Sequence, residues 1–185
     1  MVVLVLSMMA SATAMAQDWG IFELKGKVKS VTYDWCCPFN GVASYDDAGQ
    51  VVKFNTSGRV IVPEDGKIVR NNMGTAIDIQ FYICEGEIED WLNQKLVYDS
   101  EGRLQKVDTG GYECERYTKF VYDGEGNVTK KVDIEEADGD IYTMVTTYTY
   151  VSFDANGNWT ERVATTTCDW ADTETKTEVR TILYY

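Results

Sequence analysis

Carboxylates are the most numerous side chains of this sequence that can do acid–base chemistry. Asp and Glu supply 30 of its 185 residues, and many of them are crowded into three clusters. The clusters are Glu85, Glu87, Glu89 and Asp90; Glu113 and Glu115; and Glu135, Glu136, Asp138 and Asp140. Two carboxyl groups held at a fixed separation can hydrolyse glycosidic bonds. An acidic β protein contains many such pairs by composition alone, so the clusters do not single out an enzyme.

The chain contains no histidine, which excludes His-based triads, His–Cys dyads and His-ligated metal sites. A calcium site is an alternative at "EEADGD", residues 135–140, where acidic side chains surround a glycine. The spacing does not match an EF-hand, and we expect a solvated hairpin tip whose charges oppose edge-to-edge association. We therefore expect no catalytic residue, no metal and no cofactor.

Five cysteines are candidates for disulfide bonds: Cys36, Cys37, Cys84, Cys114 and Cys168. An odd number leaves at least one thiol unless a partner supplies another. Adjacent cysteines rarely bridge each other, so we expect Cys36 or Cys37 to pair with one of the other three, and the sequence does not choose among them. A zinc site is disfavoured because no C-x-x-C pair is present.

Two tryptophans, Trp35 and Trp170, are the candidate ligand-binding residues. Both lie beside cysteines and outside the regular turns. Buried aromatic rings fill cores, whereas exposed rings on a sheet stack on sugars or anchor a protein partner. We expect these two rings to be exposed.

A seven-residue motif recurs five times. It predicts the turns of the scaffold that carries the carboxylates, cysteines and tryptophans described above. It reads aromatic, Asp or Asn, two free positions, Gly, a polar residue and an apolar residue. The copies are "YDDAGQV" at 45–51, "FNTSGRV" at 54–60, "YDSEGRL" at 98–104, "YDGEGNV" at 122–128 and "FDANGNW" at 153–159. The acidic or amide side chain bonds the backbone two residues on, and glycine supplies the positive φ of a type I turn with a G1 bulge. The predicted turn glycines are Gly49, Gly58, Gly102, Gly126 and Gly157.

Period-two alternation fills the segments between these turns. In residues 141–153, Tyr142, Met144, Tyr148 and Tyr150 share one face, and Ile141, Val145, Val151 and Phe153 share the other. Segments 27–35, 76–84 and 177–185 read the same way, and residues 168–175 form the expected last connection. Residues 87–98 fit a short helix or a strand, and we favour a strand because they run directly into a turn motif.

The fold class that follows is all-β. We expect an antiparallel β-meander of roughly 9–13 strands in successive hairpins. The sheet is expected to be twisted or curled into an open barrel-like shape.

"YDSEGRLQKV" and "YDGEGNVTKKV" resemble YD repeats of the Rhs type. The ending "FDANGNWTERV" followed by "EVRTILYY" is similar to small exported proteins of Bacteroidetes type that carry degenerate copies. The resemblance covers about Tyr45–Tyr185 and implies a meander of hairpins. Five irregularly spaced copies are too few to close a toxin-enclosing shell, and the family motif carries no catalytic residue.

The first 16 residues have the pattern of a secretory signal peptide. An apolar run begins at Val2 and is followed by Ala14-Met15-Ala16, an A-x-A cleavage site before Gln17. It is shorter than the roughly 20 apolar residues of a membrane span. We expect residues 17–185 to form one domain that is exported to the periplasm, the cell surface or the exterior.

The net charge of −13 disfavours nucleic acid and anionic membranes as partners, because both bind clustered Lys and Arg. The function expected from the sequence is that of an exported, non-enzymatic binding or envelope-associated protein. Its partner is a protein or a glycan. The alternatives are a carbohydrate-binding module and a carboxylate-based hydrolase.

Overall fold

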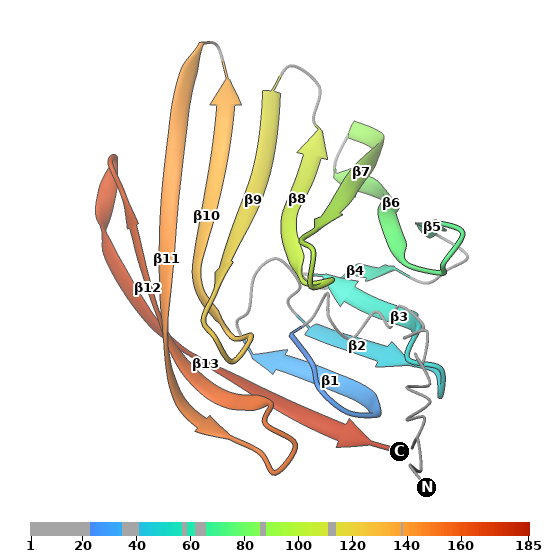
Figure 1. Cartoon of the computed structure of the whole chain (residues 1–185). Coiled ribbons are helices and arrows are strands. Elements are labelled where there is room, and N and C mark those ends of the chain that lie inside the picture. Colours follow the sequence, from blue (N-terminus) through green and yellow to red (C-terminus); the bar gives the residue numbers. More distant parts are fainter. Residues whose placement is uncertain are drawn as a thin grey trace, which may run out of the picture.

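A computed structural model describes residues 23–34, 41–56, 59–61, 66–85, 88–110, 114–137 and 139–185. Every regular element in these ranges is a β-strand, and thirteen strands form one sheet (Figure 1). The strands are β1 (Val28–Asp34), β2 (Gly41–Tyr45), β3 (Val51–Thr56), β4 (Arg59–Ile61), β5 (Gly66–Arg70), β6 (Ala76–Glu85), β7 (Ile88–Tyr98), β8 (Leu104–Gly110), β9 (Cys114–Tyr122), β10 (Val128–Ala137), β11 (Asp140–Phe153), β12 (Trp159–Cys168) and β13 (Ala171–Tyr184). The predicted all-β fold class is confirmed, and β7 is a strand as favoured.

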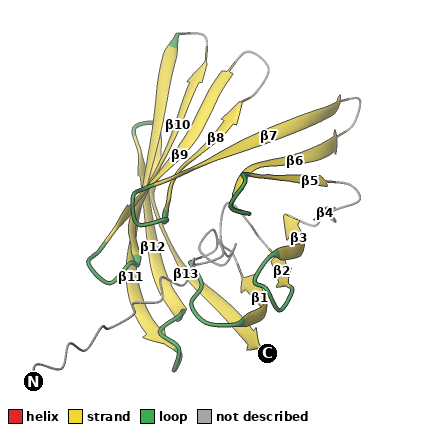
Figure 2. Cartoon of the chain, turned by 45° about the vertical axis from the view of Figure 1, so that its right-hand side comes forward, coloured by secondary structure: helices red, strands yellow, loops and turns green. Residues whose placement is uncertain are grey.

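The sheet is an open, curled meander whose first and last strands pair. Its order is β4-β3-β2-β1-β13-β12-β11-β10-β9-β8-β7-β6-β5, so the edge strands are β4 and β5. Both views show the sheet bending round until these edges approach each other (Figures 1 and 2). Only four residues separate Ile61 from Gly66, which limits these two residues to about 18 Å apart.

The two edge strands run in the same direction along the sheet. All twelve pairings between neighbouring strands are antiparallel, so direction reverses twelve times from β4 to β5. β4 and β5 therefore cannot form a hairpin with each other. β4 is bonded to β3 and β5 to β6.

Positive-φ glycines mark the hairpin turns at one end of the sheet. Gly49, Gly102, Gly126 and Gly157 have φ between 76° and 84°, as the motif requires. Gly58 lies outside the described residues. A further turn of the same type, missed in the sequence, links β5 to β6 and contains Gly74 at φ 83°. Its motif is hidden because Arg70 replaces the aromatic residue.

One side-chain oxygen closes each of these turns. In the β9–β10 turn, Asp123 Oδ1 accepts from the backbone N–H of Glu125 at 2.9 Å and of Asn127 at 2.8 Å. The same pair of bonds is made by Asp46, Asn71, Asp99 and Asp154. The motif predicted the first bond at Asp46, Asp99, Asp123 and Asp154 but not at Asn71, and the second bond holds the residue that leads into the return strand.

Tyrosine hydroxyls connect neighbouring hairpins at this end of the sheet. Tyr98 donates to the carbonyl of Ala76 at 2.8 Å, Tyr122 to Leu104 at 2.7 Å and Tyr150 to Val128 at 2.7 Å. Each acceptor is the first residue of an even-numbered strand, β6, β8 or β10. Burial is the main reason why the pKa values of Tyr122 and Tyr150 lie above that of an ordinary phenol. Hydroxyls that keep their protons join successive hairpins into one curved unit.

The hydrophobic core lies inside the curl near the motif turns. Its most buried members are Val28, Val31, Ala76 and Ile79, and the large Trp159 ring is also buried. The predicted alternation of β11 holds as far as Tyr150, with Ile141 exposed on the outer face. The placement of Phe153 on that face is wrong. Register shifts after Tyr150 interrupt the alternation, and the Phe153 ring lies 5.3 Å from the Tyr150 ring.

Two further observations complete the comparison with the sequence. The last connection is shorter than the predicted 168–175, because Cys168 pairs directly with Ala171 and only Asp169 and Trp170 form the turn. The described part of the chain offers no helix with the length and apolarity needed to cross a membrane.

The β9–β10 turn provides a matched test of the positive-φ requirement. Gly126 has φ 84°, whereas Gly124 has no such constraint, and a Cβ at either would meet no atom within 4 Å. We expect Gly126→Ala to lower the free energy of unfolding by about 1–2 kcal/mol, because only its backbone is strained. Gly124→Ala should be neutral or slightly stabilising. Urea denaturation measures both, and equal losses would contradict the turn assignment.

The turn carboxylates make stability depend on acidity. The pKa values of Asp99, Asp123 and Asp154 are lowered in the fold. Burial, the largest single effect, raises them, but the bonds from the turn N–H groups and from neighbouring side chains together outweigh it. A lowered folded-state pKa stabilises the fold above the unfolded-state pKa of about 3.9 and ceases to do so as the pH falls.

Replacing all three aspartates by Asn keeps an oxygen acceptor, as Asn71 shows naturally, and removes the titration. The triple variant should lose less stability than the unmodified protein as the pH falls below about 4. Urea denaturation at a series of pH values measures this loss. Parallel curves for the two proteins would contradict the prediction.

Candidate functional site

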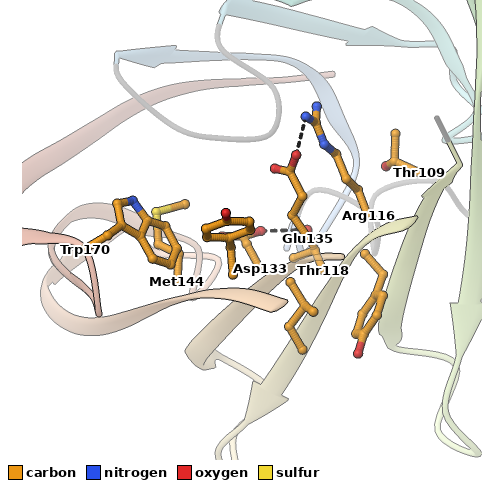
Figure 3. Close-up of a pocket in the computed structure, with 10 residues that line it drawn as sticks. Thr109, Arg116, Thr118, Asp133, Glu135, Met144 and Trp170 are labelled. Carbon is orange, nitrogen blue, oxygen red and sulfur yellow. Dashed lines mark hydrogen bonds and ion pairs between the residues drawn. The ribbon is translucent and has the colours of Figure 1, made fainter. Parts of the chain in front are cut away.

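A pocket of about 240 Å³ opens at the end of the sheet opposite the motif turns. It is formed by β8 to β11 and the β12–β13 turn, and most of its side chains come from the inner face (Figure 3). The lining residues are Thr109, Arg116, Tyr117, Thr118, Asp133, Ile134, Glu135, Tyr142, Met144 and Trp170. Ligand pockets commonly measure about 300–1,000 Å³, so this one suits a single ring or side chain.

Two aromatic rings form one wall of the pocket. Trp170, at the tip of the two-residue turn, is 54% exposed, and Tyr142 at the start of β11 is 42% exposed. Their ring centroids are 5.5 Å apart at an interplanar angle of 86°. Met144, the cross-strand partner of Cys168, lies beside Trp170 in Figure 3. Trp170 is thus an exposed ring, as expected, while Trp35 lies outside the described residues.

The adjoining part of the lining is polar and built from cross-strand pairs of β9 and β10, with Glu135 directly beside Tyr142 in the register. Arg116 lies opposite Glu135 in the register and binds it at 2.6 Å. Thr118 lies opposite Asp133 and donates a hydrogen bond to its Oδ1 at 2.7 Å. The second oxygen of Asp133 lies 3.0 Å from Lys131 Nζ. Figure 3 shows Arg116, Glu135, Thr118 and Asp133 between Trp170 on one side and Thr109 on the other.

The pocket therefore combines an apolar ring surface with fixed donors and acceptors. Arg116 presents N–H donors, the carboxylates of Asp133 and Glu135 present acceptors, and the threonine hydroxyls present both. A ligand with one apolar face and several hydroxyl groups matches this lining. Its C–H bonds can contact the negative face of an aromatic ring, and its hydroxyl groups can bond to the polar side chains.

A second charged cluster lies inside the curl at the motif-turn end, where it is largely buried. Arg162 is 1% exposed and binds Glu178 at 2.6 Å and Glu23 at 3.0 Å. The guanidinium groups of Arg162 and Arg180 lie 4.1 and 3.9 Å from the Trp159 ring centroid. The Trp159 indole donates to Glu23 at 3.1 Å. Because these groups satisfy one another, the cluster fastens the stretch before β1 to the sheet.

Other candidate residues do not gather into a site. In the ranges that the structure describes, no three acidic or cysteine side chains come close enough to hold a metal ion. The thiol of Cys168 is free. Cys84 and Cys114 lie on β6 and β9, but their side chains, like Cys36 and Cys37 entirely, are outside the described part. A disulfide that involves Cys36 or Cys37 stays a prediction.

No model of a protein family matches the chain, and no curated protein matches it. A proposal about function therefore depends on the geometry of the site.

Sequence reasoning identified part of the pocket. Glu135 belonged to a recognised acidic cluster, and Tyr142 and Met144 were placed on one face of a strand. Arg116, Thr118 and Asp133 were not singled out. Period-two spacing puts Arg116 and Thr118 on one face, but only the β9–β10 register shows that they meet Glu135 and Asp133.

The two arginine ion pairs should differ sharply in their contribution to stability. Arg162→Met leaves the largely buried Glu178 without its partner and should lower the free energy of unfolding by about 3–5 kcal/mol. Arg116→Met removes a pair whose side chains are 56% and 39% exposed, and should cost about 1 kcal/mol or less. Urea denaturation distinguishes them. Similar losses would show that the Arg162 cluster does not fasten the fold.

Proposed function

We propose that this is an exported binding protein without catalytic turnover, and that its ligand occupies the pocket lined by Trp170. The observation that carries the proposal is the exposed Trp170–Tyr142 pair directly beside the Arg116–Glu135 ion pair. Exposed aromatic rings beside fixed polar groups are typical of binding sites, because rings bury area with little loss of conformational freedom.

The arrangement of the carboxylates supports binding rather than hydrolysis. Glycosidases place two carboxyl groups on either side of the bond that is broken, about 5–9.5 Å apart. Asp133 and Glu135 are about 7 Å apart along one strand, but they project side by side from that strand and not from opposite sides of the pocket. Each is already bound to a cation, Lys131 or Arg116. Neither faces a second acid across the pocket among its lining residues.

The same features favour a carbohydrate over a protein as the ligand. The pocket volume of about 240 Å³ accommodates one ring rather than an interface. A sugar ring offers an apolar face to Trp170 and hydroxyl groups to Arg116, Glu135 and Asp133. Neutral sugars suit this wall because its paired charges largely cancel.

A glycan array followed by calorimetry on the strongest ligand tests the proposal. Trp170→Ala should weaken binding at least about tenfold, equivalent to 1.4 kcal/mol, without changing the fold, because the ring is exposed. Phe153→Ala removes another exposed ring, at the opposite end of β11, and should bind normally. Absence of any glycan ligand, equal affinity of the Trp170→Ala variant, or release of a hydrolysed product would contradict the proposal.

A further inference from the structure

Four lysines form a diagonal stripe across the outer face of β7 to β10. They are Lys95, Lys106, Lys119 and Lys130, one on each consecutive strand. Lys106 lies directly opposite Lys119, Lys95 lies between Asp108 on β8 and Asp78 on β6, and Lys130 lies opposite Val121. With strands about 4.8 Å apart and residues about 3.4 Å apart, the stripe is about 20 Å long.

The stripe faces away from the pocket. Val97 and Val121, which share its face, are exposed, whereas the neighbouring Lys131 points inward and is buried. Lys95 and Lys119 are themselves exposed. The stripe and most of the pocket's side chains thus lie on opposite faces of the sheet, and Tyr117, which lines the pocket and lies under two of these lysines, is shared by both.

The positive charge of the stripe is only partly neutralised. Lys106 binds Asp108 at 2.8 Å, but Lys95, Lys119 and Lys130 form no ion pair within the described ranges. Lys106 and Lys119 both lie over the Tyr117 ring, at 4.4 and 5.0 Å from its centroid. Like charges placed opposite each other on neighbouring strands oppose folding. Their retention in a chain of net charge −13 calls for a counter-charge from outside.

We infer that the lysine stripe binds a linear anionic polysaccharide, one that carries carboxylate or sulfate groups. A row of cations on adjacent strands matches charges repeated along an extended chain. The remaining surface is predominantly acidic, so an anionic polymer is repelled elsewhere and directed to the stripe. Lysine presents compact charges that suit single anionic groups without a fixed paired geometry.

Other macromolecular anions fit less well. A protein interface is centred on accessible aromatic anchors, whereas lysine side chains cover the Tyr117 ring here. Nucleic-acid binding commonly involves about 6–10 phosphate contacts, more than four lysines can supply. Acidic residues Glu115 and Glu136 lie on the same face beyond the stripe and limit its length.

Binding to polygalacturonate, measured by calorimetry or interferometry at low salt, tests this inference. We expect affinity to fall about tenfold or more between 20 and 300 mM NaCl, because bound counterions are released. Lys119→Gln should weaken binding several-fold, and Lys119→Arg should retain it. Lys176→Gln changes net charge equally but removes an exposed lysine of β13 paired with Glu174, and should bind normally.

Three results would overturn the inference: no binding at 20 mM NaCl, equal effects of Lys119→Gln and Lys176→Gln, or single-stranded DNA that binds as tightly as polygalacturonate. Neutral dextran should not bind the stripe. Because Trp170→Ala leaves the stripe intact, its binding of polygalacturonate should be unchanged. The pocket proposal and the stripe proposal can therefore be contradicted independently of each other.

Discussion

The sheet depends on a pair of hydrogen bonds in each motif turn, in which one side-chain oxygen of Asp or Asn accepts from two backbone N–H groups. This pair of bonds fixes the turn, and the turn fixes which residues of the two strands lie opposite each other. The five described copies stand at the same end of the sheet, where tyrosine hydroxyls connect one hairpin to the next. The turn hydrogen bonds and the tyrosine hydroxyl bonds together hold the hairpins in one curved sheet. The buried Arg162 cluster then fixes the stretch before β1 to the inside of that curve.

The rigid end of the sheet leaves the opposite end available for chemistry. There the two-residue β12–β13 turn presents Trp170 to solvent. Side chains of β9 and β10 that meet Trp170 are held by cross-strand ion pairs and hydrogen bonds. Rigid strands that carry an exposed aromatic tip are a suitable support for binding. The same two strands present lysines on their outer face, because alternate residues point to opposite sides.

Patterns within a few residues of sequence predicted much of the fold, whereas contacts between distant residues could not be predicted from the sequence. The turn motif is read within seven residues, so hairpins, strands and fold class followed from it. The turn at Asn71 was missed because Arg70 removed the aromatic signal. Register was the decisive unknown: bulges displace it by one residue, and only its outcome pairs Arg116 with Glu135 or Lys106 with Lys119. The net charge of −13 likewise concealed a positive stripe, since a sum over the chain does not describe one face.

The most direct measurement of the central claim is an NMR titration of the ¹⁵N-labelled protein with neutral oligosaccharides. Binding in the pocket should shift amide signals of residues 116–118, 133–135 and 142–144 and the indole N–H of Trp170. The sugar signals should persist without new products over days. Shifts confined to the motif-turn end or the outer face, or the appearance of cleaved sugars, would contradict the account.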